Sequence, residues 1–279
     1  MSGASGAAAE DGVGRFAAID WTRPWLPSIE TRGRRWQAAA LDSPARYLSV
    51  MNDDARAAAH VTGRARPLAF IAQEALPDGA SYEGHIAETG CVPTRHNLHD
   101  FFNGQMWFAY PRVKAALNAR QAEQIETRGI GPTRGGVRDA FTLFDENAVF
   151  FAYSDAMLAD ALRRFDWRAL FIEGRAAWGK RCEARIFGHA LLEKLVAPYK
   201  ACTGHAWLVP VPADYFSLDD TARRALLDER VTASLNAGTI ESRAFSPIPV
   251  LGVPGWWQAN ESPEFYDDTT VFRSGRRSA

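Results

Sequence analysis

The stretch from His96 to Ala109, HNLHDFFNGQMWFA, constrains this chain most, because its residues separate cleanly when they are placed on a helix. At about 100° per residue, a stripe roughly 100° wide carries its polar side chains. The stripe consists of His96, His99, Asp100, Asn103 and Trp107. We therefore predict a helix that buries a wide apolar side and presents imidazoles, a carboxylate and an amide together. A plain solvent-facing stripe would have the same pattern.

Composition restricts the class of protein. The 279 residues are 47% hydrophobic and 23% charged, as in an ordinary globular protein. The net charge of −1 provides no global field to attract nucleic acid or an anionic membrane. No window approaches 18 uninterrupted apolar residues, and three scattered cysteines suit a reducing compartment. We expect a cytoplasmic protein with a small-molecule substrate, bound to neither nucleic acid nor membrane.

The chain is organised as one main unit. Residues 1–14 are small and polar without the pattern of a secretory signal, so we expect a disordered lead-in. Residues 15–273 carry mixed helix and strand patterns, and residues 274–279 form a tail. Helices outweigh strands and do not alternate with them regularly. These features predict one helix-rich α+β domain with a small antiparallel sheet.

A hairpin is expected near residues 141–152. Two aromatic, β-prone runs, Phe141–Phe144 and Ala148–Ala152, flank the polar triplet Asp145-Glu146-Asn147. This arrangement is typical of paired antiparallel strands joined by a turn. The acids of the triplet would then be exposed, so we expect no catalytic role for them.

Two further segments bear on the site. Residues 185–197 have helical spacing, which places His189 and Glu193 at the edge of an apolar face. The glycine-rich, basic segment 128–138 predicts an irregular surface loop. That loop could hold an anion on its backbone amides, but it lacks the spacing of the known phosphate-binding motifs.

Metal-assisted hydrolysis is the function that we favour from these residues. His96, His99 and Asp100 are adjacent on the predicted helix and are suitable ligands for a divalent ion, which lowers the pKa of bound water. Asn103 would orient the substrate or an oxyanion. His189 or Glu193 would transfer protons or support the ligands, and further ligands could come from Asp139 or Asp267. A base formed by a histidine and an orienting carboxylate, without metal, is a second route.

Two alternatives stay open. In a purely structural interpretation, His96 caps the helix, His99 binds a backbone carbonyl and Asp100 pairs with an arginine. In the other, the protein is a non-catalytic module that binds a ligand or a protein. A flat surface with Trp107 and Trp256 open to solvent would favour that module.

Four stretches carry a resemblance to a known family. They are residues 96–104 (HNLHDFFNG), 138–146 (RDAFTLFDE), 187–194 (FGHALLEK) and 249–257 (PVLGVPGWW). With them the chain, from about Ala17 to Arg273, resembles a bacterial family of uncharacterised proteins, domain-of-unknown-function family 3025. The resemblance implies no established activity, so no catalytic role is carried over from it.

Overall fold

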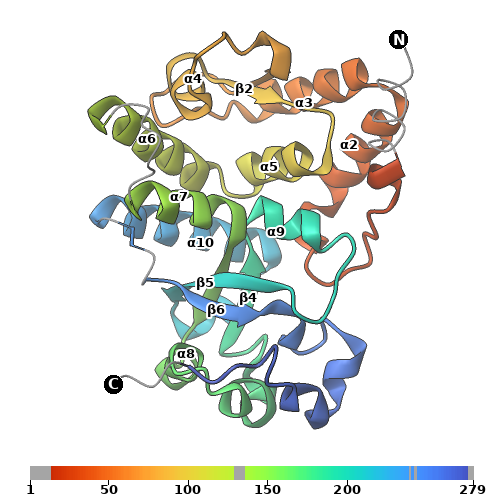
Figure 1. The fold of residues 1–279 in the computed structure, drawn as a ribbon, viewed down its shortest axis with the longest axis vertical. Coiled ribbons are helices and arrows are strands. Elements are labelled where there is room, and N and C mark those ends of the chain that lie inside the picture. The colour runs from red at the N-terminus through yellow and green to blue at the C-terminus, as the bar shows by residue number, and fades with distance from the viewer. Residues whose placement is uncertain (1–13, 129–135, 239, 242–243, 276–279) are drawn as a thin grey trace.

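The computed structural model describes residues 14–128, 136–238, 240–241 and 244–275 (Figure 1). The expected lead-in and most of the loop expected at 128–138 therefore lie outside the described residues. Residues 136–138 of that loop are described, and they are helical rather than irregular, because a helix begins at Gly136. None of the helices in these ranges is both long and apolar enough to cross a bilayer.

The first part of the chain is helical and contains a small parallel sheet. A turn η1 (Pro27–Ile29) leads into α2 (Glu30–Asp42) and α3 (Pro44–Ala58). Strand β1 (Ala69–Ala72) pairs in parallel with β2 (Cys91–Thr94), and η2 (Gln73–Ala75) and α4 (Tyr82–Thr89) connect them. Gly90 ends α4 with a φ of 79°, a left-handed conformation that glycine adopts without strain.

Helix α5 (Leu98–Ala109) is the centre of the upper half of the molecule (Figure 1). Eleven of its residues are buried, because aromatic rings of α2 and α3 pack on one side of it and helices from later in the chain pack on the others. Trp36 packs edge-on against Phe101 and Phe108 of α5. A Cβ on Gly104 would lie 2.9 Å from the Trp36 ring, so glycine is required for this close approach. Helices α6 (Pro111–Arg128) and α7 (Gly136–Asn147) follow.

The lower half is built on a four-stranded sheet. Its order is β4 (Cys182–Ile186), β3 (Ala148–Tyr153), β5 (Thr203–Pro210) and β6 (Ser246–Pro249). The β3–β5 pair is parallel and the outer pairs are antiparallel, so the sheet is mixed rather than purely antiparallel. Residues 148–152 of β3 are fully buried, as expected of a central strand covered on both faces.

Helices cover both faces of this sheet. Figure 1 shows α7, α9 (His189–Lys194) and α10 (Asp220–Ala237) on one side. On the other side lie α8 (Ala156–Arg163) and the C-terminal turns. Those turns are η7 (Val250–Gly252), η8 (Gln258–Glu261) and η9 (Pro263–Asp267). Three further short turns complete the fold: η3 (Arg168–Glu173), η4 (Arg175–Ala177) and η5 (Ala213–Ser217). The expected α+β class is confirmed.

The expected hairpin near 141–152 is wrong. Residues 136–147 form α7, and only residues 148–153 form a strand, which pairs with β4 and β5. Phe141, Phe144 and Asp145 are buried together, a spacing of three to four residues that belongs to a helix. The triplet after Phe144 contains no glycine, which a tight hairpin turn requires. Asp145 is therefore buried rather than exposed.

Candidate active site

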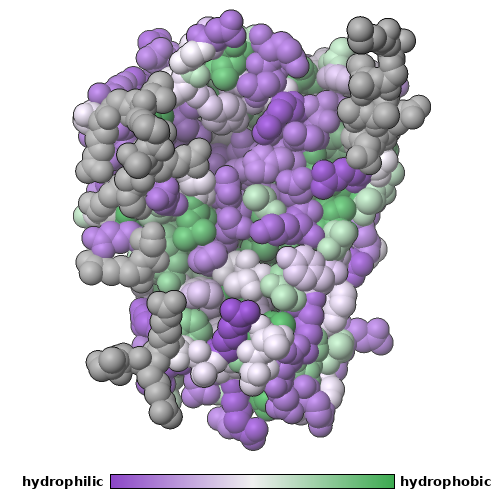
Figure 2. Space-filling model, in the orientation of Figure 1, coloured by the Kyte–Doolittle hydropathy of each residue, from purple (hydrophilic) through white to green (hydrophobic). Residues whose placement is uncertain are grey.

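Five helices bring nine polar side chains together between the two halves of the molecule. We call them the polar cluster: Tyr82 and Glu83 from α4, His99 and Asn103 from α5, Lys114 and Asn118 from α6, Asp145 from α7, and His189 and Glu193 from α9. Hydrophilic residues also cover much of the face over α5 and α9 (Figure 2). The cluster is buried at Asn103, Lys114, Asp145 and His189, and it reaches solvent at His99 and Glu193.

Two imidazoles face each other in this cluster. The Nε2 atoms of His99 and His189 lie 3.0 Å apart, and the ring planes are nearly perpendicular at 79°. Each ring has a carboxylate on its other side. Glu193 Oε2 lies 3.2 Å from His99 Nδ1, and Asp145 Oδ2 lies 3.8 Å from His189 Nδ1. The pair therefore forms a continuous row of titratable groups from the surface to the interior.

The hydrogen bond between the rings restricts where protons can be. Burial lowers the pKa of His189 to about 4, so this ring is neutral at neutral pH and has one donor and one acceptor nitrogen. If His189 Nε2 accepts, His99 donates from both nitrogens and carries a positive charge. If His189 Nε2 donates, His99 is neutral and still donates to Glu193. The contacts of His99 with His189 and Glu193 fit both states, whereas His189 Nδ1 faces Asp145 as a donor only in the first.

A buried ion pair lies behind His189. Lys114 Nζ donates to Asp145 Oδ1 at 2.6 Å and to Asn103 Oδ1 at 2.8 Å, and Asn103 Nδ2 donates to the Tyr82 hydroxyl at 3.1 Å. Burial raises the pKa of Asp145, but the Lys114 charge outweighs it together with the charge that His189 takes up at low pH and the Lys114 hydrogen bond, and the net shift is downward. Asp145 is therefore ionised, and its charge balances Lys114.

Glu83 is the second carboxyl of the cluster and titrates differently. Burial and the nearby Asp145 charge raise its pKa to about 7, while Lys114 and the hydrogen bond from Asn118 oppose the shift. Asn118 Nδ2 donates to Glu83 Oε2 at 2.7 Å. Two neighbouring carboxyls whose pKa values are driven apart are typical of sites where one donates a proton and the other stays charged.

Backbone contacts fix these side chains in place. Asp228 of α10 accepts from the backbone N–H groups of Arg112 and Val113 at 3.1 and 2.9 Å, which anchors the first turn of α6 beside Lys114. Gly188 precedes α9 against the end of α7. A Cβ on Gly188 would lie 2.5 Å from the Asn147 Cα, so glycine permits the close approach that places His189 next to Asp145.

The sequence prediction groups only some of these residues correctly. His99 contacts both His189 and Glu193, as expected. Helix α9 spans His189–Lys194 and not residues 185–197, because residues 182–186 form β4. Asn103 lies in the cluster, with its amide bound to Lys114 and Tyr82. Asp139 and Asp267 are exposed and take no part in the cluster contacts.

His96 and Asp100 face other partners. His96 precedes α5, and its Nε2 lies 2.9 Å from the Ala40 carbonyl oxygen. Asp100 forms a two-pronged ion pair with Arg95, so the structural interpretation is confirmed for this residue. Within the described ranges, no three His, Cys, Asp or Glu side chains are grouped as metal ligands. His96, His99 and Asp100 do not converge on one point.

Four residues of the site escape the sequence analysis altogether. Tyr82, Glu83 and Asn118 show no pattern that distinguishes them from surface residues. Lys114 does carry a signal, since it is one of only four lysines against 28 arginines and follows directly after the apolar Val113. Asp145 was expected in a turn, and helical spacing from Phe141 would have placed it inward.

Comparison with known proteins gives one match. The family described as "Protein of unknown function (DUF3025)" matches residues 68–276, about three quarters of the chain. The chain belongs to this family. All nine residues of the polar cluster lie inside the part matched by DUF3025, whereas α2 and α3 precede it. Neither a curated protein nor a solved structure matches the chain.

Proposed function

We propose that the chain is a hydrolase-like enzyme that works by general acid–base catalysis at the polar cluster. The observation that carries the proposal is the His99–His189 pair, with facing Nε2 atoms 3.0 Å apart and a carboxylate beyond each ring. A histidine oriented by a carboxylate is the usual general base. His99 is the member of the pair that reaches solvent, and its Nε2 can take up a proton when the contact with His189 opens.

Each residue has a distinct part in this scheme. His99, which reaches solvent, takes a proton from the attacking water at Nε2 when its contact with His189 opens, and Glu193 orients His99 and stabilises its charged form. Glu83, whose pKa is about 7, donates a proton to the leaving group. Asn103, Lys114 and Asp145 are positioning residues, because they contact one another and hold His189 in its neutral, buried environment.

A metal-assisted variant of the same chemistry remains a proposal with less support. Two imidazoles backed by carboxylates resemble the outer support of metal ligands. The described residues provide these two nitrogens but no third ligand beside them. His96 and Asp100, which were expected as ligands, contact the Ala40 carbonyl and Arg95 instead. The binding-module alternative has less support too, because Trp107 is buried and only Trp256 is partly open.

The test is a panel of chromogenic carboxylic esters, phosphate esters and glycosides assayed with the full chain. His99→Asn, His189→Asn and Glu83→Gln should each lower kcat by at least about 100-fold, the range of general acid–base catalysis. Two control variants outside the cluster should stay within about twofold. They are Glu88→Gln, exposed on the same helix as Glu83, and His205→Asn in β5.

Three outcomes would contradict the proposal. They are no hydrolysis of any class, hydrolysis unaffected by the two histidine variants, and equal losses in the control variants. A chelator separates the two versions of the chemistry. Activity that survives the chelator supports acid–base catalysis alone, whereas activity lost with the chelator and restored by a divalent ion supports the metal-assisted version.

A further inference from the structure

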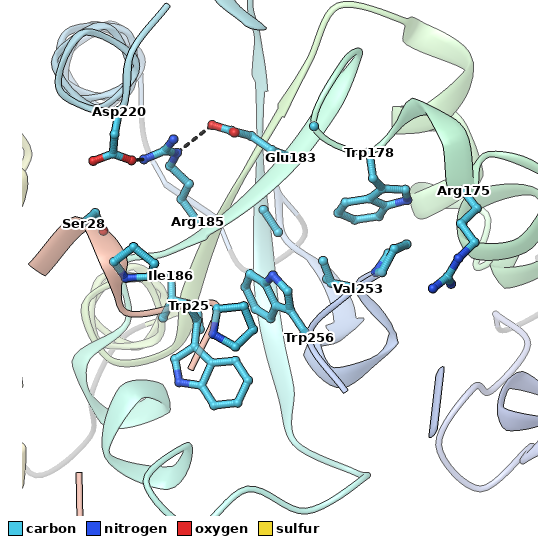
Figure 3. A pocket seen from close by; sticks show the side chains of 15 residues that line it. Trp25, Ser28, Arg175, Trp178, Glu183, Arg185, Ile186, Asp220, Val253 and Trp256 are labelled. Carbon is cyan, nitrogen blue, oxygen red and sulfur yellow. Dashed lines mark hydrogen bonds and ion pairs between the residues drawn. The ribbon is translucent and has the colours of Figure 1, made fainter. Parts of the chain in front are cut away.

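Two adjoining cavities, each of about 460 Å³, lie away from the polar cluster. The arginine cavity is lined by Thr31, Arg32, Arg35, Asp54, Thr221 and Arg224, at the first turns of α2 and α10 and on α3. The tryptophan cavity is lined by Trp25, Trp178, Arg185 and Trp256, among others (Figure 3). Pro27, Ser28 and Asp220 line both, so the two cavities adjoin at these residues.

Positive charge exceeds negative charge around the arginine cavity. Three guanidinium groups line it, those of Arg32, Arg35 and Arg224, against two carboxylates, those of Asp54 and Asp220. Asp54 pairs with both Arg32 and Arg35, and Asp220 pairs with Arg224 and also with Arg185, which lines the tryptophan cavity. The lining is left with one unmatched positive charge, which favours a bound anion.

Arg32 is the guanidinium with the weakest compensation. Its Nε lies 3.5 Å from Asp54, a carboxylate that also pairs with Arg35, and its charge rests 4.4 Å from the centre of the Phe108 ring. Burial, followed by the Arg224 and Arg35 charges, lowers the pKa of Arg32 to about 10. Three guanidinium groups that crowd each other around one cavity would be relieved by a bound anion.

The tryptophan cavity provides a different surface. Figure 3 shows Trp25 and Trp256 together on one side and Trp178 with Arg175 on the other. The indoles of Trp25 and Trp256 lie 5.8 Å apart at 53°. The Glu183–Arg185–Asp220 ion pairs run along the cavity toward Ser28, where the arginine cavity begins (Figure 3). Such indole faces stack on flat or ring-shaped groups.

We propose that the arginine cavity binds the phosphate of a phosphate monoester whose ring lies in the tryptophan cavity. Guanidinium forks match phosphate oxygens in pairs, and the Thr31 and Thr221 hydroxyls line the same space as further donors. The phosphate would supply the missing negative charge. Because no residue of the polar cluster is involved, this binding site stands independently of the proposed hydrolysis.

The probes are inorganic phosphate, ribose 5-phosphate and adenosine monophosphate, titrated by calorimetry at constant ionic strength. We expect saturable binding of each and an increase in Tm of the full chain with ligand concentration. Arg32→Gln and Arg224→Gln should weaken binding at least about tenfold, the loss expected for one charge-assisted contact. Arg34→Gln is the matched control, because Arg34 lies on the same helix but pairs with Glu30 outside the cavity.

Further variants separate the two halves of the site. Trp256→Leu should weaken the binding of both monoesters but leave the affinity for inorganic phosphate unchanged. Tighter binding of ribose 5-phosphate identifies the ring as a sugar, and tighter binding of adenosine monophosphate identifies it as a nucleobase. Arg32→Lys, which keeps the charge, should retain part of the binding if Arg32→Gln fails through charge rather than misfolding. Absence of saturable binding, or the same loss in Arg34→Gln, would overturn the proposal. Equal affinity for all three probes, unaffected by Trp256→Leu, would overturn the assignment of the ring to the tryptophan cavity.

Discussion

Replacing Lys114 by methionine is the sharpest test of the polar cluster. The change keeps most of the length of the side chain and removes its charge, which leaves the Asp145 carboxylate without its main partner. The two charges are 2.6 Å apart, and their side chains are only 6% and 11% exposed. With an effective dielectric constant of about 20, Coulomb's law gives an attraction of about 6 kcal/mol at this distance.

We expect Lys114→Met to lower the free energy of unfolding by about 3–5 kcal/mol at neutral pH, the usual cost of leaving one buried charge unpaired. The effect should depend on pH. Lys114 is a main cause of the lowered pKa of Asp145, so without it burial should raise that pKa above 3.8. The stability that the paired, ionised Asp145 contributes is present above pH 3.8 and is lost as the pH falls through its folded pKa. The difference between the two proteins should therefore shrink toward about pH 4.

Urea unfolding followed by tryptophan fluorescence measures both effects. Lys180→Met is the matched control, because Lys180 is exposed, and it should change stability by less than about 0.5 kcal/mol. The double variant Lys114→Met/Asp145→Leu should recover most of the loss, since both charges are then gone. A loss below about 1 kcal/mol for Lys114→Met, or a loss independent of pH, would refute the buried pair.

Three further outcomes follow from the same site. The folded pKa of Glu83 is raised from 4.5 to about 7, so the stability that its neutral form contributes is present below pH 4.5 and is lost as the pH rises through 7. Glu83→Gln should therefore flatten the decline in the free energy of unfolding between pH 4.5 and 7, measured with urea. An unchanged slope would contradict the raised pKa. His189 should remain neutral in NMR spectra of its ring nitrogens down to about pH 5, since its pKa is about 4, and titration near 6.5 would contradict its burial. Gly188→Ala should lower the free energy of unfolding by about 1–3 kcal/mol in the same urea assay, because its Cβ would meet the Asn147 backbone. Gly238→Ala is the control, because its Cβ would meet no atom within 4 Å and its φ is not left-handed, and equal losses in the two would refute the close packing.

The sequence by itself determined the features that repeat along one element. Apolar spacing predicted the buried helix α5, composition and element pattern predicted the α+β class, and four stretches indicated the family that matches residues 68–276. Local spacing also placed His99 and Asn103 on one side of a helix. Each of these properties depends on residues within a few turns of each other, and periodicity records such relations directly.

Only the tertiary structure decided which polar groups meet. His99 and His189 are 90 residues apart, and Lys114 and Asp145 are 31 apart, so no periodic pattern links them. The β-prone residues after Ala140 could by themselves form a strand or a helix. Burial of Phe141 and Phe144 on one side of α7 selected the helix and turned Asp145 inward. Burial beside Lys114 then fixed the charge of Asp145, which raises the pKa of Glu83 in turn. The electrostatics of the site are thus a property of the packed helices and not of any single segment.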